Sequence, residues 1–366
     1  MNEGKDMEKK NLILSSIFIL LSISLSYLYL FRENQQNKNI YEKIEAGKHV
    51  NYLVVGDSIG RSSGASDQEH KWFTLLEKHL HEKYDGTFNR HLVVQSGATA
   101  FEGLYKLKNR VINHPIDIVF IVFGENDRKY MNSMDFSRFY QSLIEEIIIR
   151  FPSAELITIT ESSLDNDEFI KVINRISEKY HATNIDMRVP FKKSGLSSDQ
   201  LTKDLVHPND LGYSLYTTEI EKNIENSIEI NKPVLTSILQ TDQLTSIPMY
   251  TKHTYKTIDS SFKLKDHHFT TSKIGASIEF EFKGSFLGVN VIRSEKGGMV
   301  DVFIDDQFVT TLSLWWPFKK ERSLYVSSGL SEGEHIVKFQ VSLNKSKYNI
   351  SNEHLFQISS IITNKR

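Results

Sequence analysis

The chain has 366 residues, of which 39% are hydrophobic and 25% are charged. This composition is typical of globular proteins and excludes a disordered, collagen-like or low-complexity chain, while the length predicts two domains. The net charge of -2 argues against nucleic acid as a partner, because it provides no basic field to attract phosphates. The absence of cysteine excludes disulfide scaffolds, cysteine-ligated zinc sites and thiol catalysis.

The N-terminal region contains an uncharged apolar run at residues 11–31. At about 1.5 Å per residue, a helix of this length would span the roughly 30 Å hydrocarbon core of a bilayer. A buried core helix is one alternative, but it would show a polar stripe. A cleaved signal peptide is another, because Ser24-Leu25-Ser26 resembles a small-x-small cleavage site. The apolar run continues past that site to Phe31, which favours an uncleaved anchor.

We therefore predict a cytoplasmic tail at residues 1–10, a transmembrane signal-anchor helix at 11–31 and a polar spacer at 32–48. A short tail before a large domain favours placement of the tail inside the cell and of the domain outside it. The predicted localisation is the cell membrane, with a single pass and the large domains extracytoplasmic.

Residues 49–230 alternate between short apolar runs and amphipathic stretches. The expected strands are 50–55, 91–94, 116–123, 155–160 and 183–187, and the expected helices are 68–83, 102–112, 133–151, 166–181 and 209–227. Strands that alternate with helices at this spacing predict an α/β domain of the flavodoxin-like, three-layer kind, with a parallel sheet covered on both faces.

Residues 231–366 show a different rhythm, in which period-2 runs are separated by turns bearing Gly, Asp and Ser. The clearest runs are 276–282, 287–292, 300–304 and 335–341. This pattern predicts an all-β sandwich domain. Trp315-Trp316 could offer a sugar-stacking platform there, although a Trp pair beside a proline is more often edge packing or a domain interface.

The first expected strand ends in Gly56-Asp57-Ser58-Ile59. A serine just beyond the carboxyl end of a central strand lies where open α/β sheets bind their ligands, although the same residues also suit a turn and helix cap. The third strand ends near Asn126, which a flavodoxin-like strand order places in the same crevice as Ser58. Its amide could donate a hydrogen bond to an oxyanion.

A carboxylate and a histidine lie three residues apart just before the last expected helix, at Asp204 and His207. His207 could act as general base, with Asp204 orienting its ring and stabilising the imidazolium. A histidine in a loop is usually inert, so this interpretation depends on its combination with Ser58. The Gly97 N–H, after the second expected strand, could be another oxyanion donor.

These motifs resemble the SGNH (GDSL-type) hydrolases over about residues 50–227. Gly56-Asp57-Ser58-Ile59 looks like the nucleophile block, Gly97 like the block-two glycine, Gly124-x-Asn126-Asp127 like the third block and Asp204-x-x-His207 like the last. The asparagine often found shortly before the block-two glycine is replaced here by Gln95 and Ser96.

The resemblance implies that Ser58 is the nucleophile, His207 the base and Asp204 its orienting partner. It implies an oxyanion hole made of the Ser58 and Gly97 backbone N–H groups and the Asn126 side chain. The family's usual chemistry is ester hydrolysis or acyl transfer through an acyl-serine, with no metal and no organic cofactor. The C-terminal part resembles the jelly-roll modules, similar to galactose-binding-like domains, that accompany some of these esterases.

The preferred hypothesis is a membrane-anchored serine esterase that removes short acyl groups, in particular acetyl, from a cell-surface glycan. Its expected partners are an acylated glycan or other small ester substrate and the membrane, through residues 11–31. One alternative is an O-acyltransferase that moves acetyl onto a cell-wall polysaccharide with the help of a membrane partner that exports acyl groups. A lipase or thioesterase is a second alternative, and a non-catalytic glycan-binding surface protein is a third.

Overall fold

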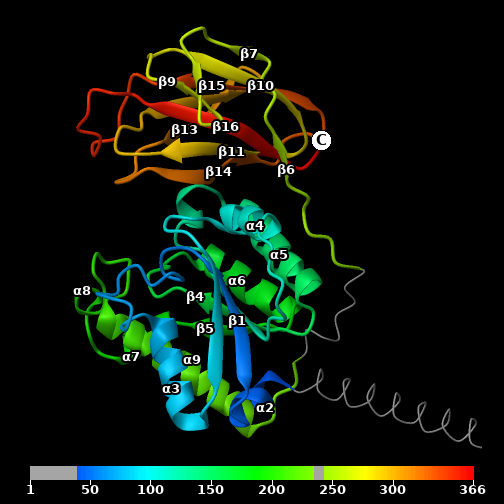
Figure 1. Ribbon diagram of the computed structural model, residues 1–366, viewed down its shortest axis with the longest axis vertical. Coiled ribbons are helices and arrows are strands. Elements are labelled where there is room, and N and C mark those ends of the chain that lie inside the picture. The colour runs from blue at the N-terminus through cyan, green and yellow to red at the C-terminus, as the bar shows by residue number, and fades with distance from the viewer. Residues whose placement is uncertain (1–38, 235–242) are drawn as a thin grey trace, which may run out of the picture.

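The computed structural model describes residues 39–234 and 243–366, which form an α/β domain and an all-β domain (Figure 1). The α/β domain is built on a parallel sheet of order β2-β1-β3-β4-β5. Its strands are β1 (His49–Gly56), β2 (Thr87–Val94), β3 (Ile118–Val122), β4 (Glu155–Thr160) and β5 (Thr183–Asp186). The predicted fold class, an α/β domain followed by an all-β domain, is confirmed.

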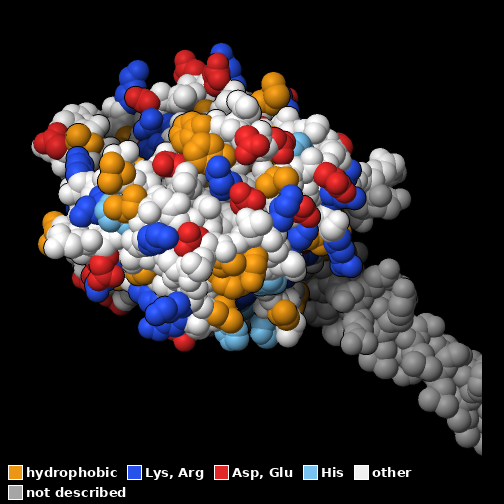
Figure 2. All heavy atoms as spheres, turned by 90° about the horizontal axis from the view of Figure 1, so that it is seen from above, with side chains coloured by type: hydrophobic (Ala, Val, Ile, Leu, Met, Phe, Trp, Pro, Cys, Tyr) orange, Lys and Arg blue, Asp and Glu red, His pale blue; other side chains and the backbone are white. Residues whose placement is uncertain are grey.

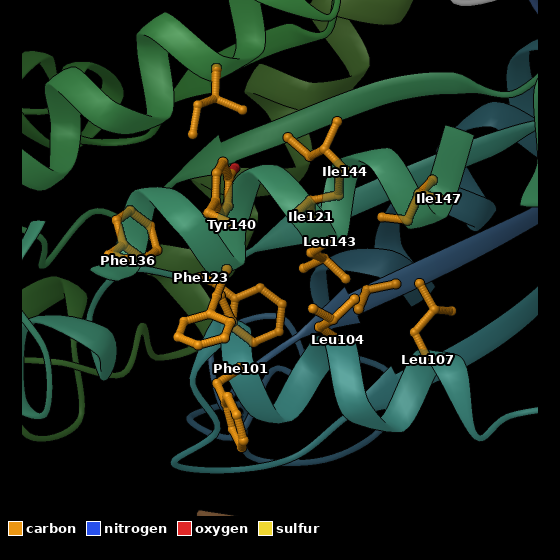
Figure 3. Packing of buried hydrophobic residues seen from close by; sticks show 14 of the residues in the cluster. Phe101, Leu104, Leu107, Ile121, Phe123, Phe136, Tyr140, Leu143, Ile144 and Ile147 are labelled. Atoms are coloured by element: carbon orange, nitrogen blue, oxygen red, sulfur yellow. The ribbon is translucent and has the colours of Figure 1, made fainter. Parts of the chain in front are cut away.

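Helices cover both faces of this sheet because its strands are apolar on both sides. One face is covered by α2 (Ile40–Glu45), α3 (Trp72–Tyr84) and α9 (Asp210–Glu229). The other is covered by α4 (Ala100–Lys108), α5 (Ser133–Arg150) and α6 (Asp167–Lys179). Figure 3 shows how Leu104 of α4 and Leu143 of α5 meet Ile121 of β3 in the second of these layers.

The structure corrects the expected spacer at residues 32–48. Its end forms α2, in which Ile40, Tyr41 and Ile44 are at most 3% exposed and pack into the core of the α/β domain. Asn39 caps this helix by accepting a hydrogen bond from the Tyr41 N–H at 3.2 Å. Two short helices that the sequence did not predict, α7 (Arg188–Lys193) and α8 (Ser198–Leu201), follow β5.

The predicted transmembrane helix at residues 11–31 lies outside the described residues. Within residues 39–234 and 243–366, no helix combines the length and the apolar character that a membrane crossing requires.

The all-β domain consists of two antiparallel sheets that enclose a core of aliphatic and aromatic side chains. One sheet has the order β13-β12-β15-β10-β7, and the other β14-β11-β16-β9-β8, with β6 (Tyr250–Lys252) beside β16. The first contains β7 (Thr257–Ile258), β10 (Ser277–Lys283), β12 (Met299–Ile304), β13 (Gln307–Ser313) and β15 (Glu334–Val341). The second contains β8 (Lys263–Lys265), β9 (His268–Thr271), β11 (Phe286–Arg293), β14 (Lys320–Ser328) and β16 (Phe356–Thr363).

The two domains share a continuous apolar interface in which the β11/β14 side of the all-β domain faces α4 (Figure 1). Phe101 of α4 is fully buried and packs edge-on against Phe286 and Tyr325, with ring centroids 5.8 Å apart in both pairs. Aromatic pairs in this arrangement contribute about 0.5–1.5 kcal/mol beyond their area of burial. This contact fixes the all-β domain beside the loops that follow β1 and β2.

Candidate active site

The candidate site lies at the carboxyl edge of the parallel sheet, where the loops after β1, β2 and β3 meet. The Asp57 N–H donates to the Val122 carbonyl at the end of β3, over 3.1 Å. The Gln95 N–H, just beyond β2, donates to the Gly56 carbonyl at the end of β1, also over 3.1 Å. The strand order reverses between β1 and β3, and this is the position at which open α/β sheets bind ligands.

Ser58, His207 and Asp204 form one chain of hydrogen bonds. Ser58 Oγ lies 2.8 Å from His207 Nε2, and His207 Nδ1 lies 2.8 Å from Asp204 Oδ2. The His207 backbone N–H also donates to Asp204 Oδ1 at 2.8 Å, so this carboxylate holds both the ring and the backbone of the histidine. Partial burial would raise the pKa of Asp204, but the hydrogen bonds from His207 outweigh it, and the pKa falls below its ordinary value.

The loop that carries His207 packs closely against the loop after β1. This close packing is possible because residue 64 of the latter loop is a glycine and has no side chain. A Cβ at Gly64 would lie 2.0 Å from the Pro208 carbonyl oxygen, which is far inside van der Waals contact. The same two loops are linked by the Ser66 N–H, which donates to Asp210 Oδ1 at 2.8 Å. The close approach of these two loops sets the Ser58–His207 distance.

Asn126 is tied to the residue that precedes Ser58. Its side-chain Nδ2 donates to Asp57 Oδ2 at 2.5 Å, while Asp57 Oδ1 accepts from the Ile59 N–H at 2.8 Å. An asparagine amide carries two N–H groups, so one holds Asn126 to Asp57 and the second is available to a ligand. Asp57 therefore connects the loops after β1 and β3.

Three fully buried acids surround this connection: Asp57, Asp127 and Glu161. Burial raises the pKa of Asp57 to about 6 and that of Asp127 to about 8. Burial, followed by the charge of Asp57, raises the pKa of Glu161 well above its ordinary value. At neutral pH, Asp57 is therefore mostly ionised and Asp127 mostly protonated, while the surroundings of Glu161 favour its protonated form.

Gly97 follows β2 with φ of +75°, a left-handed conformation that glycine adopts without strain. Its neighbour Ser96 binds the nucleophile loop, because Ser96 Oγ lies 3.1 Å from both Arg61 Nη1 and Ser63 Oγ. The Gly97 carbonyl accepts a hydrogen bond at 2.9 Å from Arg322 Nη2, on β14 of the other domain. Arg322 also binds Glu102 of α4 with Nη2 at 2.7 Å, and both side chains are 1% exposed.

The structure thus brings Ser58, His207 and Asp204 together directly, and connects Asn126 and Gly97 to the nucleophile loop through Asp57 and Ser96. The motifs in the sequence did not predict the supporting side chains. Glu161 follows an expected strand and could have been considered on that basis, whereas nothing in the local sequence around Arg322 points to a residue 225 positions away. In the described part of the chain, no group of three or more His, Asp or Glu side chains is arranged to hold a metal ion.

Residues 54–215 match the model of the GDSL-like Lipase/Acylhydrolase family. No curated protein matches the chain. Among solved structures, the chain is similar to a two-domain esterase active on acetylated mannans, with 15% identity, a TM-score of 0.62, and coverage of 89% of this chain and 94% of that one. The structure of such an esterase co-crystallised with mannopentaose gives 15% identity and a TM-score of 0.66, covering 92% of this chain and 96% of that one. At this identity the likeness extends to the fold, including the pairing of an α/β domain with an all-β domain.

Proposed function

We propose that the protein is a serine esterase of the GDSL/SGNH type that removes acetyl groups from a glycan, and the match of residues 54–215 to the GDSL-like Lipase/Acylhydrolase family supports this. The observation that carries the proposal is the hydrogen-bonded chain Asp204–His207–Ser58, with 2.8 Å at each step. A serine beside a histidine that a carboxylate orients is the arrangement that acyl transfer requires.

In the proposed reaction, Ser58 Oγ attacks the carbonyl carbon of the ester while its proton moves to His207 Nε2. The second N–H of Asn126 and the backbone N–H groups of Ser58 and Gly97 stabilise the oxyanion that forms. His207 then returns the proton to the sugar oxygen as the carbon–oxygen bond breaks, leaving acetyl-Ser58. Water attacks this intermediate, gives its proton to His207 and releases acetate, after which Ser58 regains its proton.

A short acyl group and a glycan are proposed because the α/β domain is paired with an all-β domain. The structural neighbour with this pairing acts on acetylated mannans, which supports a carbohydrate ester as substrate. The all-β domain contributes Arg322 to the surroundings of Gly97, so both domains take part in building the site.

The test is turnover of acetyl, butyryl and octanoyl aryl esters by the 366-residue chain purified in detergent. The Ser58→Ala and His207→Ala variants should lose several powers of ten in kcat, on the scale of other triads, while the acetyl ester should be cleaved fastest by the wild type. Ser214→Ala serves as the matched control, because this serine is exposed on α9 and binds the Asp210 carbonyl. A loss of only a few-fold in Ser58→Ala would refute the nucleophile.

The same assay separates hydrolysis from transfer when a glycan acceptor is added. Acetate release that is unaffected by the acceptor supports the esterase, whereas acetyl appearing on the acceptor at the expense of acetate supports an O-acyltransferase. The difference depends on how well water is excluded from acetyl-Ser58.

We further propose that the uncharged run at residues 11–31 anchors the protein in the cell membrane with both domains outside. The support is the sequence pattern. The test is the location of the protein in cells: it should remain in carbonate-washed membranes and be digested by protease added to intact protoplasts. Protection from that protease would reverse the proposed orientation, and release by carbonate would refute the anchor.

A further inference from the structure

A cavity of about 200 Å³ lies between the two domains, directly beside the candidate active site. Its walls include Gly97 and Glu102 from the α/β domain and Arg293, Arg322 and Ser323 from the all-β domain. Because Gly97 is both a wall of this cavity and a proposed oxyanion donor, a group bound here would lie next to the ester that Ser58 attacks.

The cavity region is rich in hydrogen-bond donors that lack acceptors. Arg293 Nε, Arg322 Nη1 and Trp316 Nε1 are buried without a hydrogen-bond acceptor among the described residues. Both arginines form cation–π contacts with the Trp316 ring, and their guanidinium carbons lie 5.0 Å (Arg293) and 5.3 Å (Arg322) from its centroid. Buried donors normally find acceptors, because an unsatisfied one costs about 1–3 kcal/mol. Arg293 and Arg322 line the cavity, so an anion bound there would bring hydrogen-bond acceptors to the side on which these unpartnered donors lie.

The charges around the cavity are unbalanced as well. Glu102 is the carboxylate on its wall, and it is already held by Arg322 at 2.7 Å and by Lys106 at 3.2 Å. Arg293 is only 9% exposed and forms no ion pair with a carboxylate among the described residues. Burial, followed by the charge of Arg322, lowers the pKa of Arg293 to about 10. A second charge of the opposite sign would stabilise this guanidinium.

A second hollow continues the positive character along the seam between the domains. It measures about 660 Å³, shares Ser323 with the cavity and is lined by Lys106, Lys319 and Lys320 against the single acid Glu321. By contrast, Figure 2 shows basic and acidic side chains interspersed over the outer end of the all-β domain. The excess of cations that lines the seam is thus not repeated on that outer end.

We propose that this interdomain cavity binds an anionic group carried by the substrate, a carboxylate or a phosphate, so that the glycan the protein deacetylates is an acidic one. This inference rests on the proposed function and adds the substrate class to it. Neutral sugars fit the cavity less well, because each hydroxyl that accepts a hydrogen bond also brings a proton that needs an acceptor of its own. A carboxylate or phosphate supplies acceptors and charge together, and arginine binds both in a bidentate manner.

Direct binding tests the site without any ester chemistry. The 366-residue chain would be titrated with glucuronate, glycerol phosphate and, as the neutral probe, glucose, with calorimetry and tryptophan fluorescence as readouts. Glucuronate or glycerol phosphate should bind and glucose should not, and the stronger of the two identifies the anionic group. Arg293→Met should weaken that binding about 10- to 100-fold, as expected for loss of a hydrogen bond to a charged group. Arg293→Lys should recover part of it.

Lys263→Met is the matched control, because it removes the same charge from exposed β8 of the same domain. It should bind both anions as the wild type does. Equal weakening in Lys263→Met and Arg293→Met, or binding of neither anion by the wild type, would overturn the site. Urea unfolding of each variant shows whether its fold is intact. If Arg293→Met is destabilised, the anion affinity of a stably folded Arg293→Lys variant is compared with that of the wild type instead, and an unchanged affinity would overturn the site.

The kinetic test compares acetylated acidic and neutral oligosaccharides of equal length. The ratio of their kcat/KM values should favour the acidic substrate and should fall about tenfold or more in Arg293→Met. The ratio cancels any general loss of activity, so it reports selectivity alone. If aryl acetate is not cleaved but the anions bind, the proposed function fails and the anion site stands. If aryl acetate is cleaved and the ratio is the same in both proteins, the anion site fails and the esterase stands.

Discussion

Asn126 donates from Nδ2 to Asp57 Oδ2 over 2.5 Å, so the proposed oxyanion donor is held by the residue next to the proposed nucleophile. The same carboxylate accepts from the Ile59 N–H on the other side of Ser58. One ionised side chain therefore sets the relative position of the nucleophile loop and the oxyanion donor. Asp57 acts here as a positioning residue, and its contribution can be separated from that of the acids around it.

Asp57→Asn should lower kcat for aryl acetate by about 10- to 100-fold with little change in KM. An amide cannot accept from Asn126 and from Ile59 with the same geometry, and a hydrogen bond to a charged group is worth about 1.5–3 kcal/mol. Glu161→Gln is the matched control: burial and the charge of Asp57 raise the pKa of Glu161 well above its ordinary value, and a glutamine oxygen can still accept from the Glu125 N–H, which lies 2.7 Å from Glu161 Oε2. Equal losses in the two variants would refute a specific role for the Asp57 charge.

Asn126→Ala should reduce kcat for aryl acetate by about 10²–10³-fold, the usual cost of removing one oxyanion-hole donor. The remaining donors would be the Ser58 and Gly97 backbone N–H groups. The measurement is steady-state turnover, with binding of an aryl phosphonate as a second readout that does not depend on deacylation. Turnover within a few-fold of the wild type would remove Asn126 from the site.

The free energy of unfolding should depend on pH through Asp127. Burial raises the pKa of Asp127 to about 8 from an ordinary value of 3.8, so the folded protein binds a proton that the unfolded chain has released. The stability that this proton provides is complete below about pH 4 and is lost as pH rises towards 8, a change on the order of a few kcal/mol. Asp127→Asn should flatten this part of the curve, as measured by urea unfolding at pH 5 and pH 8. An unchanged slope would show that Asp127 is ionised in the folded protein.

Gly64→Ala should reduce turnover about 10²-fold, the scale expected for a displacement of about 1 Å at a catalytic group. The added Cβ would lie 2.0 Å from the Pro208 carbonyl oxygen and would move the His207 loop away from Ser58. Gly86→Ala is the matched control, because its Cβ would meet its neighbours at 3.5 Å, an ordinary contact. Near-normal turnover by Gly64→Ala would mean that the two loops yield without separating Ser58 from His207.

The sequence predicted those elements whose pattern is local and those site residues that directly follow a strand or lie close together in the chain. The β4 strand occurs at the expected residues 155–160, and Ser58 and His207 meet because parallel strands bring their carboxyl ends to one edge. The role of Asp57 towards Asn126 depends on side-chain direction, which a motif does not specify. The contact of Arg322 with Gly97 depends on how the two domains pack, which local sequence does not specify. The helix α2 was not predicted because only three apolar residues in a polar stretch mark it, and their burial depends on packing against the core of the α/β domain.

The buried pair Arg322–Glu102 joins the all-β domain to α4, and Arg322 also binds the proposed oxyanion loop through the Gly97 carbonyl. Arg322→Met alone leaves the buried Glu102 carboxylate without its arginine partner and should destabilise the protein by about 3–5 kcal/mol. Replacing both residues, by Arg322→Met with Glu102→Leu, should recover much of that stability, because an apolar pair avoids the cost of burying two charges. The comparison is made by urea unfolding of the wild type, both single variants and the double variant.

Turnover of neutral aryl acetate should not recover along with stability. The Gly97 carbonyl loses its hydrogen bond from Arg322 Nη2 in the double variant, so the oxyanion loop is held less firmly and kcat should stay about tenfold or more below that of the wild type. A stable double variant with low kcat and an unchanged KM would assign to Arg322 a positioning role in catalysis. A stable double variant with normal kcat would limit Arg322 to holding the two domains together, and the Gly97 loop would then keep its shape through Ser96 and the nucleophile loop alone.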